Sequence, residues 1–185
     1  MSSDAPSGAK KQNVRIAISG KSGCGNSTVS RIVAKNLGLR VVNYTFKDLA
    51  RDKGLTFEEL SRLAELDPQY DLTIDRMQVQ LAQDGGCVLG SRLAIWLLRD
   101  IAYTVYLVAP LAVRAARIAR RESKDPAVAL RETEERDRRD HDRYTRLYGY
   151  EVDDFTFAAL VVDTEHLDAE GVAQRIVEGV RSARG

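Results

Sequence analysis

The segment from Gly20 to Thr28, with the sequence GKSGCGNST, combines residue types and a spacing that can bind phosphate. Gly20 and Gly25 are separated by four residues, and Ser27 follows after one more, which is the P-loop pattern. Glycines let backbone N–H groups converge on an anion, and a following helix adds partial positive charge at its N-terminus. The lysine expected after the second glycine is replaced by Asn26, so the segment predicts a phosphate site with an altered charge balance.

In such a loop the backbone wraps the β-phosphate of ATP, and the hydroxyl of Ser27 is positioned to bind Mg²⁺. The alternative is a glycine-rich turn that only joins two elements. An apolar run at 14–18 precedes the loop and a helical pattern at 29–37 follows it, which is the context that favours a P-loop. The predicted nucleotide-binding residues are Gly20, Ser22, Gly23, Cys24, Gly25, Asn26, Ser27 and Thr28.

Asn26 carries no charge, whereas the usual lysine balances charge on the β- and γ-phosphates during transfer. Lys21 lies in the same loop, directly after the first glycine. Some P-loop ATPases with a variant loop carry a lysine at that position, and Lys21 resembles theirs. One hypothesis is that Lys21 folds back over the phosphates as a catalytic cation. The other, equally open, is that Lys21 is solvated on the outside of the loop.

A charged segment at 136–143 holds a second group of candidate residues. On a helix, residues three and four apart share a face, so Arg136, Arg139, Asp140 and Arg143 form one stripe. The guanidinium group of an arginine can donate two parallel hydrogen bonds to the oxygens of one phosphate. A carboxylate among the arginines can orient their guanidinium groups or accept a hydrogen bond from a sugar hydroxyl. The alternative is a solvated charged helix, which most such runs are.

Two more basic residues lie where a parallel sheet presents its ligand side. Arg92 follows an apolar run at 87–89, and Lys47 lies in the loop after the second predicted strand. Each could instead form a surface ion pair. His141 and His166 are isolated in the sequence, so we expect both to be exposed and to have no metal or catalytic role.

Five short, mostly apolar runs predict a parallel α/β sheet, because strands buried on both faces lose the polar–apolar alternation. These runs are residues 14–19, 39–42, 87–89, 103–108 and 160–162. Three short helical patterns between the second and third runs predict a helical insertion. After the fourth run, Pro110 begins an arginine-rich helix, residues 122–129 indicate a polar link, and a charged helix follows at 130–147.

The composition is that of a globular protein with one domain, with 185 residues of which 44% are hydrophobic and 30% charged. The net charge of +1 gives no field favouring nucleic acid or membrane, and no apolar run has the roughly 18 residues of a membrane helix. Cys24 and Cys87 fit a reducing compartment, so we expect a cytoplasmic protein. Residues 1–12 indicate a disordered lead-in to a single domain at 13–185.

The order and spacing of several motifs resemble the short cytidylate kinases of archaea and some bacteria, within the nucleoside monophosphate (NMP) kinase group. The similarity runs from about Val14 to Val180. Its pieces are the loop at 20–28, FKDLA at 46–50, Asp67–Pro68, DRMQ at 75–78, RLA at 92–94 with Trp96, APL at 109–111 with Arg114 and Ile118, the pattern RDxxDxxR at 136–143, and Tyr148–Gly149.

The resemblance implies a P-loop three-layer αβα fold with a five-stranded parallel sheet, an NMP-binding insertion at about 43–84 and an arginine-bearing lid at about 119–131. It implies phosphoryl transfer from ATP, with Mg²⁺, to CMP or dCMP by a monomer. No aromatic platform interleaves the arginines, so we expect nucleotides rather than nucleic acid as partners. The implied site residues are Arg92 and Lys47 for the acceptor, Arg136 and Arg143 for phosphates, Asp140 for the sugar, and Arg117 and Arg121 in the lid.

Three features depart from the family pattern. Asn26 replaces the loop lysine, and Gly90–Ser91 stand where an acidic residue and a glycine are usual, so a partner for Mg²⁺ is missing. Lys47 and Met77 stand where arginines are common, and only Lys47 keeps the charge. The alternative function is therefore a nucleotide-binding regulatory protein of the same fold with weakened catalysis.

Overall fold

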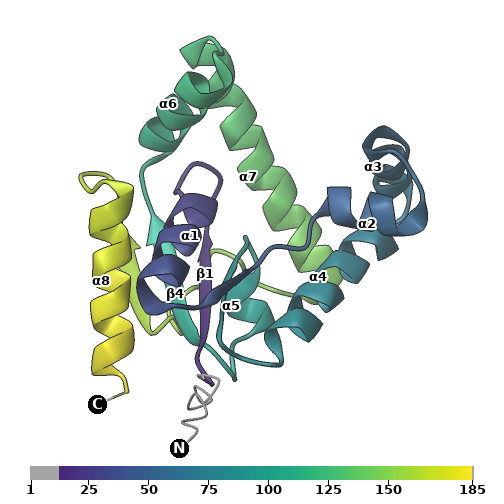
Figure 1. Cartoon of the computed structure of the whole chain (residues 1–185). Helices are drawn as coiled ribbons and strands as arrows, with labels where there is room; N and C mark the ends of the chain where they lie inside the picture. The colour runs from purple at the N-terminus through teal and green to yellow at the C-terminus, as the bar shows by residue number, and fades with distance from the viewer. Residues whose placement is uncertain (1–12, 185) are drawn as a thin grey trace, which may run out of the picture.

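The computed structural model describes residues 13–184, so the lead-in predicted at 1–12 lies outside the described residues. At its centre is a parallel sheet of five strands in the order β2-β3-β1-β4-β5 (Figure 1). The predicted five-stranded parallel sheet is confirmed, with β1 in the middle. The strands are β1 (Arg15–Gly20), β2 (Arg40–Val42), β3 (Cys87–Gly90), β4 (Tyr103–Val108) and β5 (Leu160–Asp163).

Side chains alternate across β1, and each face of the sheet carries an apolar core. Ile16 is buried on one face, among residues of α1 (Asn26–Leu37) and α8 (Ala169–Ser182). Ala17 belongs to the core on the other face, which includes the short helix α5 (Ala94–Leu97). This arrangement confirms the predicted three-layer αβα fold. Among the helices of residues 13–184, none combines the length and apolar character needed to cross a membrane.

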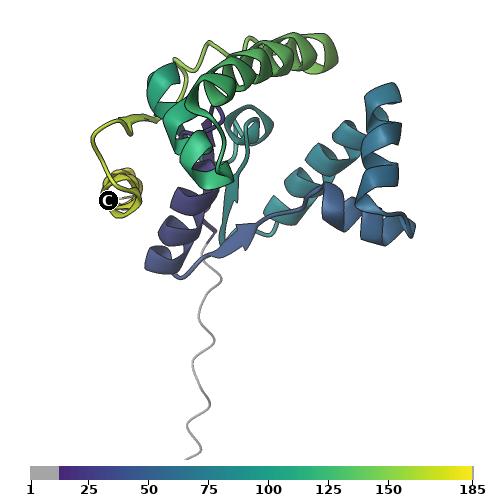
Figure 2. The ribbon, with the colours of Figure 1, turned by 90° about the horizontal axis from the view of Figure 1, so that it is seen from above.

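The predicted helical insertion consists of α2 (Phe46–Lys53), α3 (Phe57–Leu66) and α4 (Gln69–Ala82), which lie between β2 and β3 in the chain. These helices project from the sheet as a separate lobe (Figure 2). The capping box predicted at the start of α3 is present, with Thr56 N donating to Glu59 Oε2 at 2.8 Å and Glu59 N donating to Thr56 Oγ1 at 3.2 Å. The lobe has a small apolar core of its own, formed by Leu49, Ala50, Leu60 and Ile74.

Helices α6 (Leu111–Glu122) and α7 (Pro126–Tyr148) form a hairpin over the carboxyl end of β1 (Figure 1). The polar link predicted at 122–129 is wrong in length, because α6 extends to its first residue and α7 begins at Pro126. Asp125 caps α7 by accepting hydrogen bonds from two backbone N–H groups at 2.9 and 3.0 Å. The Asp125–Pro126 pair explains why α7 begins earlier than predicted, since proline suits the first helical position after such a cap.

Replacing Asp125 by alanine removes the cap of the long helix α7. We expect Asp125→Ala to lower the free energy of unfolding by about 1 kcal/mol, measured by urea denaturation. Asp100→Ala is the control, because Asp100 is exposed and has no hydrogen bond or ion pair to a described residue. Equal stability of the two variants would contradict the capping role.

Candidate active site

The glycine-rich loop joins the end of β1 to the start of α1, as predicted, and its glycines are needed there. Gly23 and Gly25 have φ values of 88° and 100°, in the left-handed region that favours glycine. A Cβ on Gly23 would lie 2.7 Å from the carbonyl oxygen of Arg114, so α6 packs directly against the loop. Within the described chain, the first turn of α1 has no acidic residue and no side-chain cap, which leaves backbone N–H groups for an anion.

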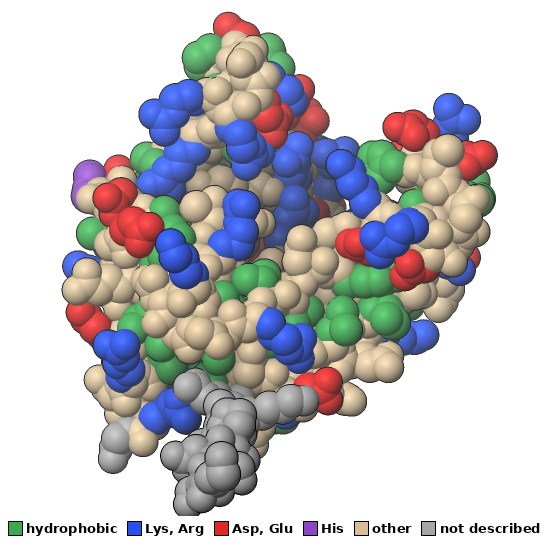
Figure 3. All heavy atoms as spheres, viewed as in Figure 1, with side chains coloured by type: hydrophobic (Ala, Val, Ile, Leu, Met, Phe, Trp, Pro, Cys, Tyr) green, Lys and Arg blue, Asp and Glu red, His purple; other side chains and the backbone are tan. Residues whose placement is uncertain are grey.

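The loop borders a hollow of about 410 Å³, which we call the first cavity. Its other walls are Gly90–Arg92 and three arginines, Arg117 and Arg121 from α6 and Arg136 from α7. No carboxylate or imidazole lines it among the described residues, so the cavity has a strongly positive potential. Figure 3 shows basic side chains gathered in the hollow beneath the α6–α7 hairpin. Of the eight predicted loop residues, all but Gly20 and Cys24 line this cavity.

Cys24 turns away from the cavity and packs in the core between the sheet, α1 and α8, where its exposed fraction is 3%. Burial raises the pKa of its thiol to about 11. The thiol is therefore protonated at neutral pH, and a thiolate is the form that reacts or binds metal. Only the backbone of Cys24 is suited to contact a phosphate.

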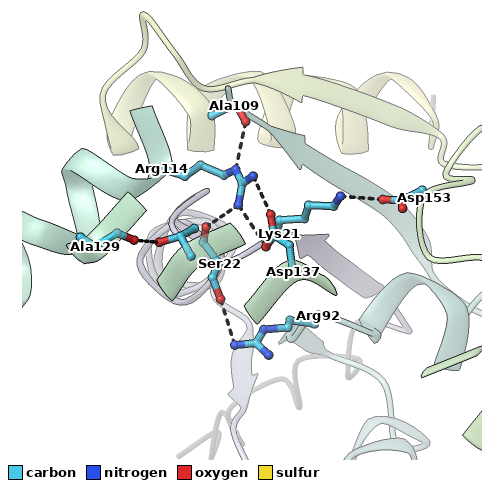
Figure 4. Close-up of polar contacts among 9 residues, drawn as sticks. Lys21, Ser22, Arg92, Ala109, Arg114, Ala129, Asp137 and Asp153 are labelled. Carbon is cyan, nitrogen blue, oxygen red and sulfur yellow. Dashed lines mark hydrogen bonds and ion pairs between the residues drawn. The ribbon is translucent and has the colours of Figure 1, made fainter. Parts of the chain in front are cut away.

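Arg114 fixes the loop to the α6–α7 hairpin, a role that the sequence analysis did not assign. Its side chain is 6% exposed, and Nη1 donates to the carbonyl oxygen of Ser22 at 3.1 Å (Figure 4). The same guanidinium binds both carboxylate oxygens of Asp137, at 3.2 and 2.7 Å. Nε donates to the carbonyl oxygen of Ala109 at 3.1 Å. Ser22 and Asp137 lie far from Arg114 along the chain, so local periodicity could not distinguish Arg114 from the other arginines of α6.

The two predicted lid arginines have different surroundings. Arg117 Nη1 donates to Thr164 Oγ1 at 2.9 Å and to the carbonyl oxygen of Gly23 at 3.4 Å, so this residue is anchored between the loop and the end of β5. Arg121 forms an ion pair with Glu122 and its side chain is 62% exposed, near the tip of the hairpin. Arg121 has the freedom expected of a lid residue, whereas Arg117 is part of the fixed wall.

Asn26 lines the first cavity, but its side-chain amide is bound to the loop itself. Its Nδ2 donates to the carbonyl oxygen of Gly20 at 2.6 Å, and its Oδ1 is buried without a partner among the described residues. Asn26 therefore closes the loop on itself. Gly90 stands where the family pattern has an acidic residue. Packing explains the glycine, because α1 lies directly against β3 and a Cβ at this position would lie 2.1 Å from Ser30 Oγ.

Lys21 forms an ion pair that the sequence did not predict. Its Nζ lies 2.7 Å from Asp153 Oδ1, in the segment between α7 and β5 (Figure 4). The other oxygen of Asp153 is 3.2 Å from His141 Nδ1. His141, which was expected to be exposed, is therefore half-buried beside a carboxylate. The hydrogen bond from Lys21 holds the pKa of Asp153 below its usual range. His166, by contrast, has a side chain that is 88% exposed, as predicted.

Arg92 lies at the end of β3 and connects the loop with α7. Its Nη2 donates to Ser22 Oγ at 2.9 Å (Figure 4). Its Nη1 forms an ion pair with Asp140. Burial raises the pKa of Asp140, and the charge of Arg92 opposes that rise. The structure therefore brings Arg92 and Asp140, two of the predicted acceptor residues, next to the loop.

A second cavity lies between the insertion and α7, and it shares Ser91 and Arg92 with the first. Arg143 lines it and forms an ion pair with Asp71 of α4. Lys47 is exposed on α2 and lines neither cavity, so its role at the acceptor stays a prediction. The remaining walls are Phe46, Ile74, Asp75, Gln78, Leu93, Tyr144, Leu147 and Tyr148.

The described residues contain no cluster of three His, Cys, Asp or Glu side chains that could hold a metal ion alone. Ser27, the predicted ligand of Mg²⁺, lines the first cavity beside the N-terminus of α1. A metal at this place would need phosphate oxygens to complete its coordination, which is how Mg²⁺ is usually held with nucleotides.

A parallel sheet whose central strand ends in a phosphate-binding loop, faced by arginines from later helices, defines the class of P-loop kinases. Solved structures share this fold. A shikimate kinase from Acinetobacter baumannii superimposes with a TM-score of 0.62 and 20% identity, covering 94% of this chain and 96% of that one. A shikimate kinase from Bacteroides thetaiotaomicron superimposes with a TM-score of 0.65 and 16% identity, covering 91% of this chain and 98% of that one.

Sequence comparison narrows the class. The profile of the cytidylate kinase-like family matches residues 15–166. A cytidylate kinase from Aeropyrum pernix is 45% identical over 167 residues, covering 89% of this chain and 97% of that protein. A cytidylate kinase from Pyrococcus horikoshii is 35% identical over 164 residues, covering 88% of this chain and 85% of that protein. The chain belongs to the cytidylate kinase-like family.

Replacing Gly23 by alanine tests the packing of α6 against the loop. We expect Gly23→Ala to weaken ATP binding at least about tenfold by calorimetry, because the loop must shift away from Arg114. Gly38→Ala is the matched control, since Gly38 also has a positive φ of 63° but has no atom within 4 Å of the added methyl group. If both variants bind ATP equally well, the close contact at Gly23 does not shape the site.

Proposed function

We propose that the chain transfers the γ-phosphoryl group of ATP to CMP or dCMP, giving ADP and CDP or dCDP. The observation that carries the proposal is the pair of cavities that meet at Ser91 and Arg92, one with a phosphate loop and basic walls, the other of nucleoside size. Membership of the cytidylate kinase-like family supports the same reaction and acceptor. We infer that the chain acts on free nucleotides as a cytoplasmic monomer.

ATP would be held in the first cavity by the loop backbone and the uncapped N-terminus of α1. Ser27 would be the protein ligand of Mg²⁺, which when bound would stabilise negative charge on the phosphates. The anchored Arg117 keeps the loop in place through Gly23 and Thr164. Arg121, at the lid predicted for residues 119–131, is free to close over the transferring group and exclude water.

The acceptor would lie in the second cavity, with its phosphate between Arg92, Arg136 and Arg143. Arginine forks bind phosphate oxygens in pairs, and Arg92 is already oriented by Asp140 and Ser22. Asp140 would face the sugar. The attacking oxygen belongs to a phosphate that is already ionised, so it needs no general base. Catalysis then rests on positioning and charge.

Lys21 would supply the charge that Asn26 lacks, after leaving Asp153. Their ion pair is partly exposed, with side chains 39% and 55% accessible, and such pairs contribute only about 0–1 kcal/mol. Exchanging one carboxylate for the more highly charged phosphates of ATP is therefore favourable, and the flexible stem of lysine permits the movement.

The reaction is tested by measuring ADP release with CMP, dCMP, UMP and AMP as acceptors. We expect turnover with CMP and dCMP that depends on Mg²⁺. Tight ATP binding without turnover for any acceptor would contradict the proposal and would favour the regulatory protein that the loop substitution first raised as an alternative.

The role of Lys21 is tested with Lys21→Ala. We expect turnover to fall by about 10²- to 10³-fold, as for loss of one donor to a developing anion. Lys35→Ala, an exposed lysine in the last turn of α1, is the control and should leave turnover unchanged. Asp153→Asn, which releases Lys21, should not reduce turnover. Unchanged turnover and ATP affinity in Lys21→Ala would show that the lysine does not compensate for Asn26.

A further inference from the structure

The second cavity has a volume of about 230 Å³, and its polar groups are unevenly distributed. Ser91 and Arg92, shared with the first cavity, mark its phosphate end. Farther along α4, two side-chain hydrogen-bond acceptors, Asp75 and Gln78, line the wall together. They are three residues apart on the helix and so lie side by side on one face. Aromatic residues of α2 and α7 form the rest of this end, which suits a planar ring.

Gln78 is held in one orientation. It is 8% exposed, and its Nε2 donates to the carbonyl oxygen of Tyr44 at 2.9 Å. Because a carbonyl can only accept, the nitrogen must face Tyr44 and the oxygen Oε1 must occupy the other edge of the amide. Oε1 is buried and has no partner among the described residues. A buried acceptor without a donor is costly, so this atom is suited to a donor brought by a ligand.

Asp75 is also only partly satisfied. The hydroxyl of Tyr148 donates to its Oδ2, and no described residue donates to Oδ1. The basic residue nearest to this wall, Arg143, is engaged by Asp71. The ring end of the cavity therefore presents two neighbouring acceptors.

We propose that Gln78 Oε1 and Asp75 Oδ1 accept the two hydrogens of the 4-amino group of cytosine, and that this pair selects cytidine over uridine monophosphate. The inference rests on the proposed function and names the part of the acceptor that is recognised. Cytosine carries an amino group at position 4, where uracil carries an oxygen acceptor. Uracil would place its oxygen against two acceptors, leaving all three unpaired.

The experiment compares kcat/KM for CMP, for UMP and for the pyrimidin-2-one ribonucleoside monophosphate, which is CMP without its amino group. We expect the wild type to prefer CMP to the analogue by at least about tenfold, as for loss of a hydrogen bond to a site built for it. In Gln78→Leu, kcat/KM for CMP should fall about tenfold while that for the analogue stays the same. Gln80→Leu, an exposed glutamine on the same helix, should behave as the wild type.

A second variant guards against loss of folding in Gln78→Leu, which also breaks the bond to Tyr44. Asp75→Asn keeps the shape and offers a donor, so it should raise kcat/KM for UMP relative to CMP at least about tenfold. Unchanged ratios among the three acceptors in both variants, with CMP still phosphorylated, would overturn this inference and leave the proposed function standing. Failure of the wild type to phosphorylate CMP would instead overturn the proposed function.

Discussion

The site depends on one buried interaction, in which the guanidinium group of Arg114 donates hydrogen bonds to the carbonyl oxygen of Ser22 and to the carboxylate of Asp137. It ties the phosphate loop to both helices of the hairpin, and the glycine at position 23 lets α6 approach closely enough for it to form. Breaking such a buried pair on one side costs about 3–5 kcal/mol, so the arrangement is held firmly. Because α6 and α7 also carry the arginines that face the loop, the same interaction sets the distance between the loop and its charges.

Local chemistry was enough to predict much of this structure. The spacing of Gly20, Gly25 and Ser27 between an apolar run and a helical pattern identified the loop, and five apolar runs identified the sheet. What the sequence did not reveal depends on contacts between distant segments. The pairing of Lys21 with Asp153 joins residues that are far apart in the sequence, and Arg114 has the same local pattern as its neighbours on α6. The length of the link before α7 was misjudged for another reason, because the Asp–Pro cap at 125–126 was read as part of a polar stretch.

Two charges that the family pattern places near the β-phosphate are absent together. The cation is replaced by Asn26, which closes the loop through Gly20, and the anion by Gly90, where a side chain would collide with Ser30. Relative to the family pattern, removing both leaves the net charge of this place unchanged, whereas removing only one would change it by a full unit beside the nucleotide. The substitutions therefore read as one coupled change, which accompanies the tight packing of α1 on β3.

The orientation of Cys24 bears on how the loop tolerates oxidants. A cysteine in a nucleotide loop is ordinarily a target for peroxide and for alkylating reagents, because cationic surroundings favour its thiolate. Here the sulfur is enclosed by aliphatic side chains and remains a neutral thiol with a pKa of about 11. Sulfenic acid formation at this position would require the loop to leave the core first, so covalent inhibitors aimed at this cysteine would find the folded protein unreactive.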